Sequence, residues 1–279
     1  MQRHATRIRA DQPWWTIDWR ELWEYRDLFR FLVQRELIII YKQSILGPLW
    51  FVLQPLLSTV VFTLVFSNMA GLSTDSIPPF VFYMSGTVLW SFFSTSMNGV
   101  AASLSTNAYM FNKVYFPRLL MPLALSASNM VQLFLNILIF CGFWGASILS
   151  GAPVHPTAGL LLVPLLILQC GMVGLGCGLW LSALTVKYRD LKFILSFLTQ
   201  LWMYATPIVY PTSLVPEKYS WILGLNPVAG PVDHFRAFFL GTRPMDGNLY
   251  LVGLLIGVTI FVSGLFLFNK VQSTFVDTI

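Results

Sequence analysis

The 279-residue sequence has little charge, few cysteines and no charged residue inside its long apolar runs. Asp, Glu, Lys and Arg make up 10% of the chain, whereas a soluble domain carries about 25%. Apolar residues make up 56% of the chain, and the mean hydropathy is +0.68. This composition excludes a disordered chain, a disulfide-stapled secreted module and an ordinary soluble enzyme. It indicates a membrane-embedded protein.

Sequence signals of catalysis and metal binding are also missing. A Walker loop needs Gly-Lys followed by Ser or Thr, and none of the six lysines stands in that context. The three cysteines lie in apolar stretches, where thiols behave as small buried hydrophobes, and His4, His155 and His234 are far apart. We therefore expect no catalytic residue, no metal site and no cofactor held by this chain, so the protein is predicted not to be an enzyme.

Six apolar runs approach or exceed the roughly 20 residues that a helix needs to cross a bilayer. They lie near 45–67, 80–103, 119–147, 157–184, 193–211 and 248–268. The predicted fold class is therefore an all-α membrane protein with six transmembrane helices. Ion-coupled carriers and proton pumps keep ionisable residues inside the membrane, and these runs contain no Asp, Glu, Lys or Arg. Any driving force must then come from another chain, or transport is passive.

The distribution of basic residues predicts the orientation. With both termini on one side, fourteen of the 17 Lys and Arg residues fall on that side, and only Lys218, Arg236 and Arg243 fall on the other. Cytoplasmic loops carry an excess of Lys and Arg, so both termini are expected in the cytoplasm. The same placement explains the pI near 9.2 by topology and contact with anionic membrane lipids. No nucleic-acid partner is needed.

Residues 1–44 form an N-terminal arm that carries an apolar stripe at helical spacing. From Trp14 onward the stripe includes Trp19, Leu22, Tyr25, Phe29 and Val33. The pattern predicts an amphipathic interface helix that lies in the head-group plane with its tryptophans as anchors. An ordinary topology-setting arm is the alternative, and both interpretations place the arm at the inner face.

The segment between spans five and six (212–247) is rich in proline and glycine. Pro216 can open a short helix, and Asn226 can cap a second helix with Pro227 at its first position and Gly241 just past its end. Neither helix is long or apolar enough to span a bilayer. We expect a re-entrant helical hairpin in the outer leaflet, with its polar groups facing protein or water.

Neutral polar, aromatic and small residues stand inside the spans. Spans one and five carry Gln54, Thr59, Phe193, Phe197, Gln200 and Tyr204. Such residues serve helix–helix packing at least as often as a substrate path, and packing is the interpretation that the residues alone favour, although the same set suits a sugar conduit. Close packing is also expected at the glycines of spans four and six, namely Gly171, Gly174, Gly176, Gly178, Gly253 and Gly257.

Several ordered motifs are similar to those of one transporter family. They lie at 41–50 with Gln54 and Pro55, at 112–118 with Pro122, at 186–192, at 206–211, and from Asn226 through Arg236 to Gly241. Together they resemble the ABC-2 type polysaccharide exporter permeases, the membrane subunits that export O-antigen, teichoic acid and capsular glycans. The resemblance covers residues from about 20 to 270.

The resemblance implies a homodimer of this chain in the cytoplasmic (inner) membrane, paired with two copies of a separate ATPase that holds ATP and Mg²⁺. Residues 45–270 would form the ABC-2 type transmembrane domain and 271–279 a cytoplasmic tail. The cargo would be an undecaprenyl-diphosphate-linked polysaccharide, with O-antigen as the first candidate. A teichoic acid or capsule exporter is the alternative. More distant alternatives are an ABC-2 exporter of drugs or lipids and a membrane scaffold that moves nothing.

The resemblance also implies roles at the inner face. The arm helix would receive the ATPase stroke together with Asn112, Lys113, Tyr115, Phe116, Pro117 and Arg118. Arg189 and Asp190 would brace an inner gate. Arg35 and Lys42 would meet the lipid diphosphate, as basic groups meet phosphate, with a purely topological role as the alternative for these two.

On the same basis, spans one and five would line the conduit through the residues named above for them. Asn226, Pro227 and Arg236 of the hairpin would close its outer end. The mechanism would be a displacement rather than a chemical reaction, because closure of the ATPase subunits would reach the spans as a rigid-body motion.

Overall fold

The computed structural model describes residues 19–42, 47, 49–111, 113–188 and 190–274, and these residues form helices joined by turns and loops. Short 3-10 and π-helical segments join or extend the α-helices. The α-helices are α1 (Trp19–Glu24), α2 (Arg26–Lys42), α3 (Leu49–Phe62), α4 (Pro79–Thr106), α5 (Ala108–Phe111), α6 (Leu120–Leu149), α7 (Val163–Lys187), α8 (Leu191–Ala205), α9 (Ser220–Leu225), α10 (Ala229–Leu240) and α11 (Gly247–Thr274). The π-helix Thr63–Met69 extends α3, and 3-10 turns lie at Ala158–Leu162, Thr212–Leu214 and Glu217–Tyr219.

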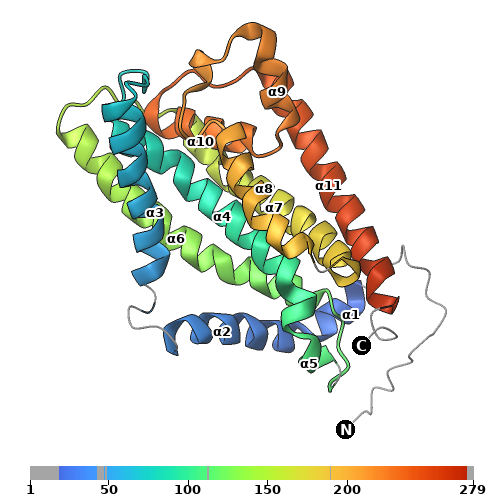
Figure 1. The fold of residues 1–279 in the computed structure, drawn as a ribbon. Helices are drawn as coiled ribbons and strands as arrows, with labels where there is room; N and C mark the ends of the chain where they lie inside the picture. Colours follow the sequence, from blue (N-terminus) through green and yellow to red (C-terminus); the bar gives the residue numbers. More distant parts are fainter. Residues whose placement is uncertain (1–18, 43–46, 48, 112, 189, 275–279) are drawn as a thin grey trace.

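The long helices run side by side as a bundle whose two ends differ (Figure 1). At one end α2 lies across the bundle, α1 lies near the last turn of α11, and the short α5 follows the end of α4. At the other end the chain folds into α9 and α10. We call these the arm end and the hairpin end. The predicted arm helix and outer helix pair therefore lie at opposite ends of the bundle.

Four of the six predicted spans correspond to helices that are long and apolar enough to cross a membrane. Among the described residues, the helices long and apolar enough to cross a membrane are Leu49–Met69, Leu120–Leu149, Ala158–Thr185 and Gly247–Gln272. They correspond to the first, third, fourth and sixth predicted spans. The run predicted at 80–103 is helix α4, which has 28 residues but lies outside this apolar group.

The run predicted at 193–211 is a helix only in its first part. Helix α8 ends at Ala205, and Thr206 has an extended backbone (φ −99°, ψ 140°). The residue before a proline is pushed out of the helical region by the proline ring, and Pro207 follows Thr206. The prediction of a helix that continues to residue 211 is therefore wrong. The apolar run extends past Ala205, but Pro207 ends the helix within it.

Helix α4 lies at the centre of the bundle and contacts α3, α6, α7 and α10. All side chains from 81 to 90 are buried. Buried serine and threonine hydroxyls of α4 bond within the helix or to a neighbour, as Ser85 donates to the carbonyl of Phe82 (2.7 Å) and Thr87 lies 3.0 Å from the hydroxyl of Thr59 in α3. Because other helices cover α4, it can carry more polar residues than a helix that faces lipid.

Glycines allow the close approach of α7 to α4 and α11, as predicted. A Cβ atom on Gly178 would lie 2.8 Å from the carbonyl oxygen of Met97 in α4, and one on Gly176 would lie 2.6 Å from Cα of Phe261 in α11. The sequence analysis missed Gly264, whose Cβ would lie 2.6 Å from the carbonyl oxygen of Gly176. Backbones therefore touch at positions where no side chain fits.

The arm is helical over its described part and packs against the start of α6. It is broken at Tyr25 between α1 and α2, and Trp14 lies outside the described residues. Leu32 of α2 is fully buried in a cluster with Phe116 and Met121. Trp19, in contrast, is 63% exposed. The predicted amphipathic pattern thus buries one side of the arm in the protein.

The two predicted helices at the hairpin end are present as α9 and α10. Helix α10 begins at Ala229, two residues later than expected for a cap at Asn226, and Gly241 ends it in the left-handed conformation (φ 77°). Its last carbonyls are bonded by other elements. The donors are the Trp144 indole to Phe239 (2.8 Å), the Thr157 N–H to Phe238 (2.9 Å) and the His155 N–H to Leu240 (3.3 Å). These bonds satisfy carbonyls that a helix end leaves free.

We predict that Gly176→Ala lowers the free energy of unfolding by about 1–3 kcal/mol, because overpacking at a backbone contact forces α7 and α11 apart. Gly142→Ala in α6 is the matched control, since its added Cβ would meet nothing within 4 Å. Thermal unfolding in detergent, followed by tryptophan fluorescence, measures both variants. A Gly176 variant as stable as the Gly142 variant would contradict the packing argument.

Candidate coupling site

Residues 107–118 join α4 to α6 at the arm end, and we call them the coupling segment. Helix α4 stops at Thr106, and Asn107 closes its end. The Asn107 side-chain amide donates to the Ser103 carbonyl (3.0 Å), and its backbone N–H donates to the same carbonyl (3.2 Å). One turn of helix, α5, and a loop then lead back to α6. The segment is therefore fixed to α4 at its first residue.

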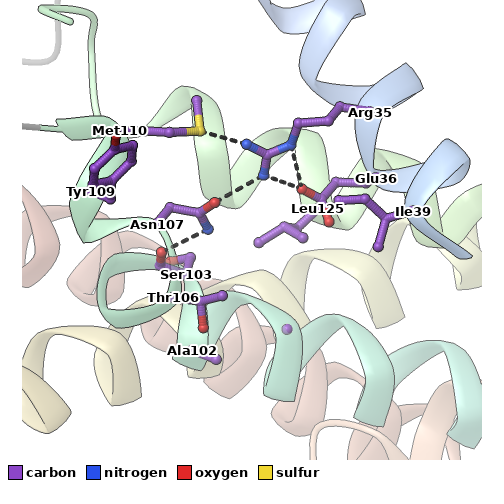
Figure 2. A pocket seen from close by; sticks show the side chains of 11 residues that line it. Arg35, Glu36, Ile39, Ala102, Ser103, Thr106, Asn107, Tyr109, Met110 and Leu125 are labelled. Atoms are coloured by element: carbon purple, nitrogen blue, oxygen red, sulfur yellow. Dashed lines mark hydrogen bonds and ion pairs between the residues drawn. The ribbon is translucent and has the colours of Figure 1, made fainter. Parts of the chain in front are cut away.

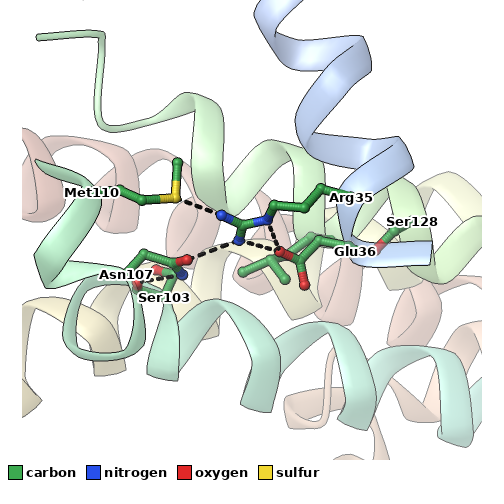
Figure 3. Close-up of polar contacts among 7 residues, drawn as sticks. Arg35, Glu36, Ser103, Asn107, Met110 and Ser128 are labelled. Carbon is green, nitrogen blue, oxygen red and sulfur yellow. Dashed lines mark hydrogen bonds and ion pairs between the residues drawn. The ribbon is translucent and has the colours of Figure 1, made fainter. Parts of the chain in front are cut away.

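Arg35 of α2 joins the arm to the start of the coupling segment (Figure 3). Its Nη2 donates to Oδ1 of Asn107 (2.9 Å), and its Nε donates to Oε1 of Glu36 (3.2 Å). The guanidinium also contacts the sulfur of Met110. The side chains of Arg35 and Glu36 are only 25% and 17% exposed. A charge pair that is this poorly hydrated depends on its hydrogen-bond partners, so Asn107 holds α2 against the end of α4.

A cavity of about 550 Å³ lies beside these contacts, between α2, α4, α5 and α6 (Figure 2). Arg35 and Ile39 border it from α2, and Leu125 borders it from α6. Gly99 forms part of its α4 wall, and a Cβ atom there would meet nothing within 4 Å. The arm is therefore attached to α4 by a few polar contacts around an open space and not by a close-packed interface.

The second half of the coupling segment is tied to α6 and α11. Phe116 is buried, and its ring lies 5.4 Å from that of Phe111. Arg118 donates to the carbonyl of Gln272 in the last turn of α11, and its guanidinium lies 5.9 Å over the Phe111 ring. An arginine at the last carbonyls of a helix satisfies acceptors that the helix leaves free. The segment thus connects α4 and α6 with the end of α11.

Electrostatics also connect this half to α1. Partial burial raises the pKa of Tyr115, and the Glu21 carboxylate of α1, which is hydrogen-bonded to the phenol, raises that pKa further. Burial lowers the pKa of the Arg118 guanidinium, and the neighbouring Tyr115 opposes this shift. The phenol therefore stays neutral at physiological pH and is available as a hydrogen-bond donor to Glu21.

The tip of the coupling segment is exposed. Val114 and Tyr115 are 61% and 58% exposed, and Lys113 is exposed with its Nζ 4.0 Å over the centroid of the Tyr109 ring. One side of the segment therefore contacts four helices of the bundle, while its tip presents a cation and apolar side chains outward. This arrangement can pass a push on the tip to α4, α6 and α11.

The other predicted residues of the inner face and of the conduit are mostly exposed where the structure describes them. Asn112 and Arg189 lie outside the described residues, Asp190 is exposed just before α8, and Lys42 is exposed at the end of α2. In the predicted conduit set, the exposed members are Gln54, Phe193, Phe197, Gln200 and Tyr204. Thr59 differs from them, because it is fully buried against Thr87.

The predicted hairpin residues come together at the far end. Asn226 is hydrogen-bonded to Trp202 of α8 (3.0 Å), Pro227 is buried, and Arg236 is 1% exposed. Among the described residues, no group of three or more His, Cys, Asp or Glu side chains could hold a metal ion.

Sequence reasoning missed Glu36, Asn107, Met110 and Gln272. Glu36 and Asn107 partner Arg35 over separations of one and 72 residues. The only local signal was the asparagine at the end of a long apolar run, a residue type that often ends helices. The contact with Gln272 spans 154 residues and uses a backbone carbonyl, so no side-chain pattern could reveal it.

Comparison with known proteins gives the family context. The family model described as "ABC-2 type transporter" matches residues 27–240. An O-antigen export system permease protein RfbA from Myxococcus xanthus is 31% identical over 268 residues, covering 93% of this chain and 98% of the relative. Proteins of the same name from Klebsiella pneumoniae are 29% and 26% identical over 254 and 255 residues, each covering 90% of this chain and 94% of the relative.

We predict that Asn107→Ala releases α2 from the end of α4 and destabilises that contact by about 1–3 kcal/mol, because it removes from the mostly buried Arg35 guanidinium the acceptor that α4 supplies and leaves only Glu36 of α2 itself as an oxygen acceptor. Hydrogen exchange of α2 peptides should then speed up. Arg30→Ala is the control, since its ion pair with Asp27 is 73% and 79% exposed and is worth under about 1 kcal/mol. Equal exchange in the two variants would show that Asn107 does not hold the arm.

Proposed function

The chain belongs to the ABC-2 type transporter family, and from this premise we propose that it is the permease subunit of an exporter that carries a lipid-linked polysaccharide across the cytoplasmic membrane. The observation that carries the proposal is the match of O-antigen export permeases over at least 90% of this chain. O-antigen on an undecaprenyl-diphosphate lipid is the first candidate cargo. A teichoic acid or capsule precursor is the second.

The permease is proposed to work as a homodimer with two copies of a separate ATPase, which binds ATP and Mg²⁺. The residues of this chain then bind, position and move, and catalyse nothing. The similarity to ABC-2 type transporters and to O-antigen export permeases supports the division, and the sequence has no Walker loop.

In the proposed membrane arrangement, α4 and α8 complete the set of six spans, with the arm end in the cytoplasm. Helix α4 is long enough and is shielded from lipid by its neighbours. Both termini are cytoplasmic, residues 45–270 form the transmembrane domain, and 271–279 form a tail. The arm lies at the inner interface, and α9 with α10 forms the outer-leaflet hairpin.

The coupling segment is proposed to receive the stroke of the ATPase. Its exposed tip at Lys113, Val114 and Tyr115 offers a cation and apolar contacts, and its base is tied to α2, α4, α6 and α11. Rigid connections of this kind convert closure of two partner subunits into a movement of the spans. Arg189 and Asp190, just before α8, are proposed to brace the inner gate.

The conduit is proposed to form between the exposed faces of α3 and α8 in two copies of the chain. Phe193 and Phe197 of α8 are 82% and 61% exposed. Gln54 and Gln200 are exposed on the same helices, and an amide costs free energy in hydrocarbon unless it finds a hydrogen-bond partner. Aromatic faces and amides without charge suit a sugar chain that must slide and not stick.

Lys42 is the better placed of the two residues proposed to meet the lipid diphosphate. Its side chain is exposed at the end of α2. Arg35 already donates to Glu36 and Asn107, so it would have to exchange these partners before it could bind a phosphate. We therefore propose Lys42 as the first contact at the inner face.

Co-expression with the ATPase from the same gene cluster tests the function. We expect the two chains to copurify as a complex whose ATP hydrolysis changes when lipid-linked O-antigen is added. A response to lipid-linked teichoic acid or capsule instead would support the second candidate, and a response to lipids or drugs alone would indicate a small-molecule exporter. A chain that binds no ATPase would overturn the exporter proposal and favour a scaffold.

We predict that Lys113→Ala stops export while ATP hydrolysis continues, because it removes the exposed cation of the coupling segment without removing a buried contact. Lys218→Ala is the matched control, since this lysine also lies beside a tyrosine ring (5.7 Å) but near the hairpin end. Complementation of an export-deficient strain, with ATPase activity measured in parallel, compares the variants. Wild-type export by the Lys113 variant would contradict the assignment of Lys113 to ATPase coupling.

A further inference from the structure

Among the described residues, polar contacts to other elements hold helix α8 mainly at its hairpin end. One face of the helix is exposed along its whole length, with Phe193, Ile194, Phe197 and Leu198 49–82% exposed toward the arm end and Leu201 and Tyr204 49% and 44% exposed toward the hairpin end. The described residues of α8 make far fewer contacts with α4 and α7 than those two helices make with each other. Just past the other end of α8, in contrast, residues 206–209 are all buried. The helix is therefore fastened at the hairpin end.

Asn226 provides one part of this fastening. Its Nδ2 donates to the carbonyl of Ala205 (3.2 Å) and to Oγ1 of Thr206 (2.9 Å), and its Oδ1 accepts from the Trp202 indole (3.0 Å) and the Val228 N–H (3.1 Å). An amide side chain offers two donors and two acceptor sites, so the Asn226 side chain uses all four of its hydrogen-bonding sites. Two of the four bonds hold Trp202 and Ala205 in the last turn of α8, and a third holds Thr206 directly after it.

Arg236 of α10 provides the other part. It is almost completely buried, its Nη2 donates to the Ile208 carbonyl (3.1 Å), and its Nε donates to Oγ of Ser85 (3.4 Å). Its guanidinium lies 3.8 Å over the ring of Phe82, a distance typical of a cation–π contact. Gly86 of α4 leaves room for the guanidinium, since a Cβ atom at this position would lie 3.1 Å from Nη2 of Arg236. Arg236 thus ties the turn after α8 to the central helix α4.

The part of α8 toward the arm end has no comparable polar attachment among the hydrogen bonds of the described residues. The Ser196 and Thr199 hydroxyls donate to carbonyls of α8 itself, namely those of Phe193 (3.2 Å) and Leu195 (2.7 Å). The Ser196 and Thr199 hydroxyls therefore form no bond to α4 or α7, and a shift of this part of α8 would not break them. Breaking the attachment at the other end would strand a buried arginine, which is costly.

We propose that Asn226 and Arg236 are positioning residues that form the fixed pivot of α8, so that its arm-end half swings while its hairpin end stays on α4. This inference rests on the proposed function in one respect: α8 is the wall of the conduit, and its swing would open the inner entrance. The pivot itself is a property of this chain alone.

Distances between spin labels test the pivot in the full chain, in nanodiscs, with its native cysteines replaced and labelled copies diluted by unlabelled ones. The inner pair is Ser196→Cys with Thr106→Cys, and the outer pair is Ala205→Cys with Ser150→Cys, all at exposed positions. Without ATPase, we expect a broad distance distribution for the inner pair and a narrow one for the outer pair. Equal widths would overturn the pivot, whether or not the chain exports a glycan.

With the ATPase bound, trapping with ATP should shift the inner distance and leave the outer distance unchanged. An outer shift as large as the inner shift would mean that α8 moves as a rigid body, which contradicts the pivot. A complex that never exports a glycan, yet shows the expected distances, would overturn the proposed cargo and leave the pivot standing.

Variants connect the pivot to its residues. Arg236→Lys keeps the charge but loses the forked guanidinium, so the outer distribution should broaden and export should be lost while ATP hydrolysis continues. Asn226→Ala should also broaden the distance distribution of the outer pair. Because this variant leaves no charge buried without a partner, it replaces the arginine variant in the test if Arg236→Lys fails to fold. Tyr83→Phe is the control, because this buried hydroxyl has no hydrogen-bond partner among the described residues and its loss should change neither pair. A narrow outer distribution in folded Arg236→Lys and Asn226→Ala would overturn the assignment.

Discussion

The backbone contact between α4 and α7 is the constraint on which the rest of the bundle depends. Gly174 and Gly178 lie where a Cβ atom would come within 3.1 Å and 2.8 Å of the carbonyl oxygens of Phe93 and Met97. This approach places α7 directly on α4, so that α3, α6 and α10 can cover its remaining sides. A helix enclosed in this way no longer needs an apolar surface, which explains the buried hydroxyls of α4 such as Ser85.

The two ends of the bundle differ in how completely they bury charged side chains. At the arm end, Lys113 and Lys42 are exposed, and the cavity between α2 and α4 leaves the arm attached to α4 by few contacts. At the hairpin end, Asp233 and Arg236 are almost completely buried. The Asp233 carboxylate accepts bonds from Thr212 (3.0 Å) and from the Met245 N–H (2.7 Å). An end fastened by buried charge resists local opening, whereas the exposed tip of the coupling segment at the arm end can adjust to a partner.

Sequence patterns were sufficient for features that depend on neighbouring residues. The packing glycines of α7, the end of α10 at Gly241 and the apolar stripe of the arm were predicted. Each of them depends on residue types and spacings that can be read from a short stretch of sequence. The central position of α4 was not predictable from the sequence. Hydropathy alone cannot distinguish a moderately polar helix that crosses the membrane inside a bundle from a helix that does not cross the membrane. The bond between Arg35 and Asn107 joins residues 72 apart, and nothing in either neighbourhood specifies the other.

The burial of Arg236 follows from the length of α8. Its 15 residues, at 1.5 Å each, span about 22 Å, which is less than the roughly 30 Å hydrocarbon core. In the proposed membrane arrangement, the turn at 206–209 supplies part of the remaining depth, and its backbone is not helical. Non-helical backbone at that depth must find its hydrogen bonds within the protein. Asn226 and Arg236 supply donors to the carbonyls of Ala205 and Ile208, so a buried cation is the consequence of ending a membrane helix early at Pro207.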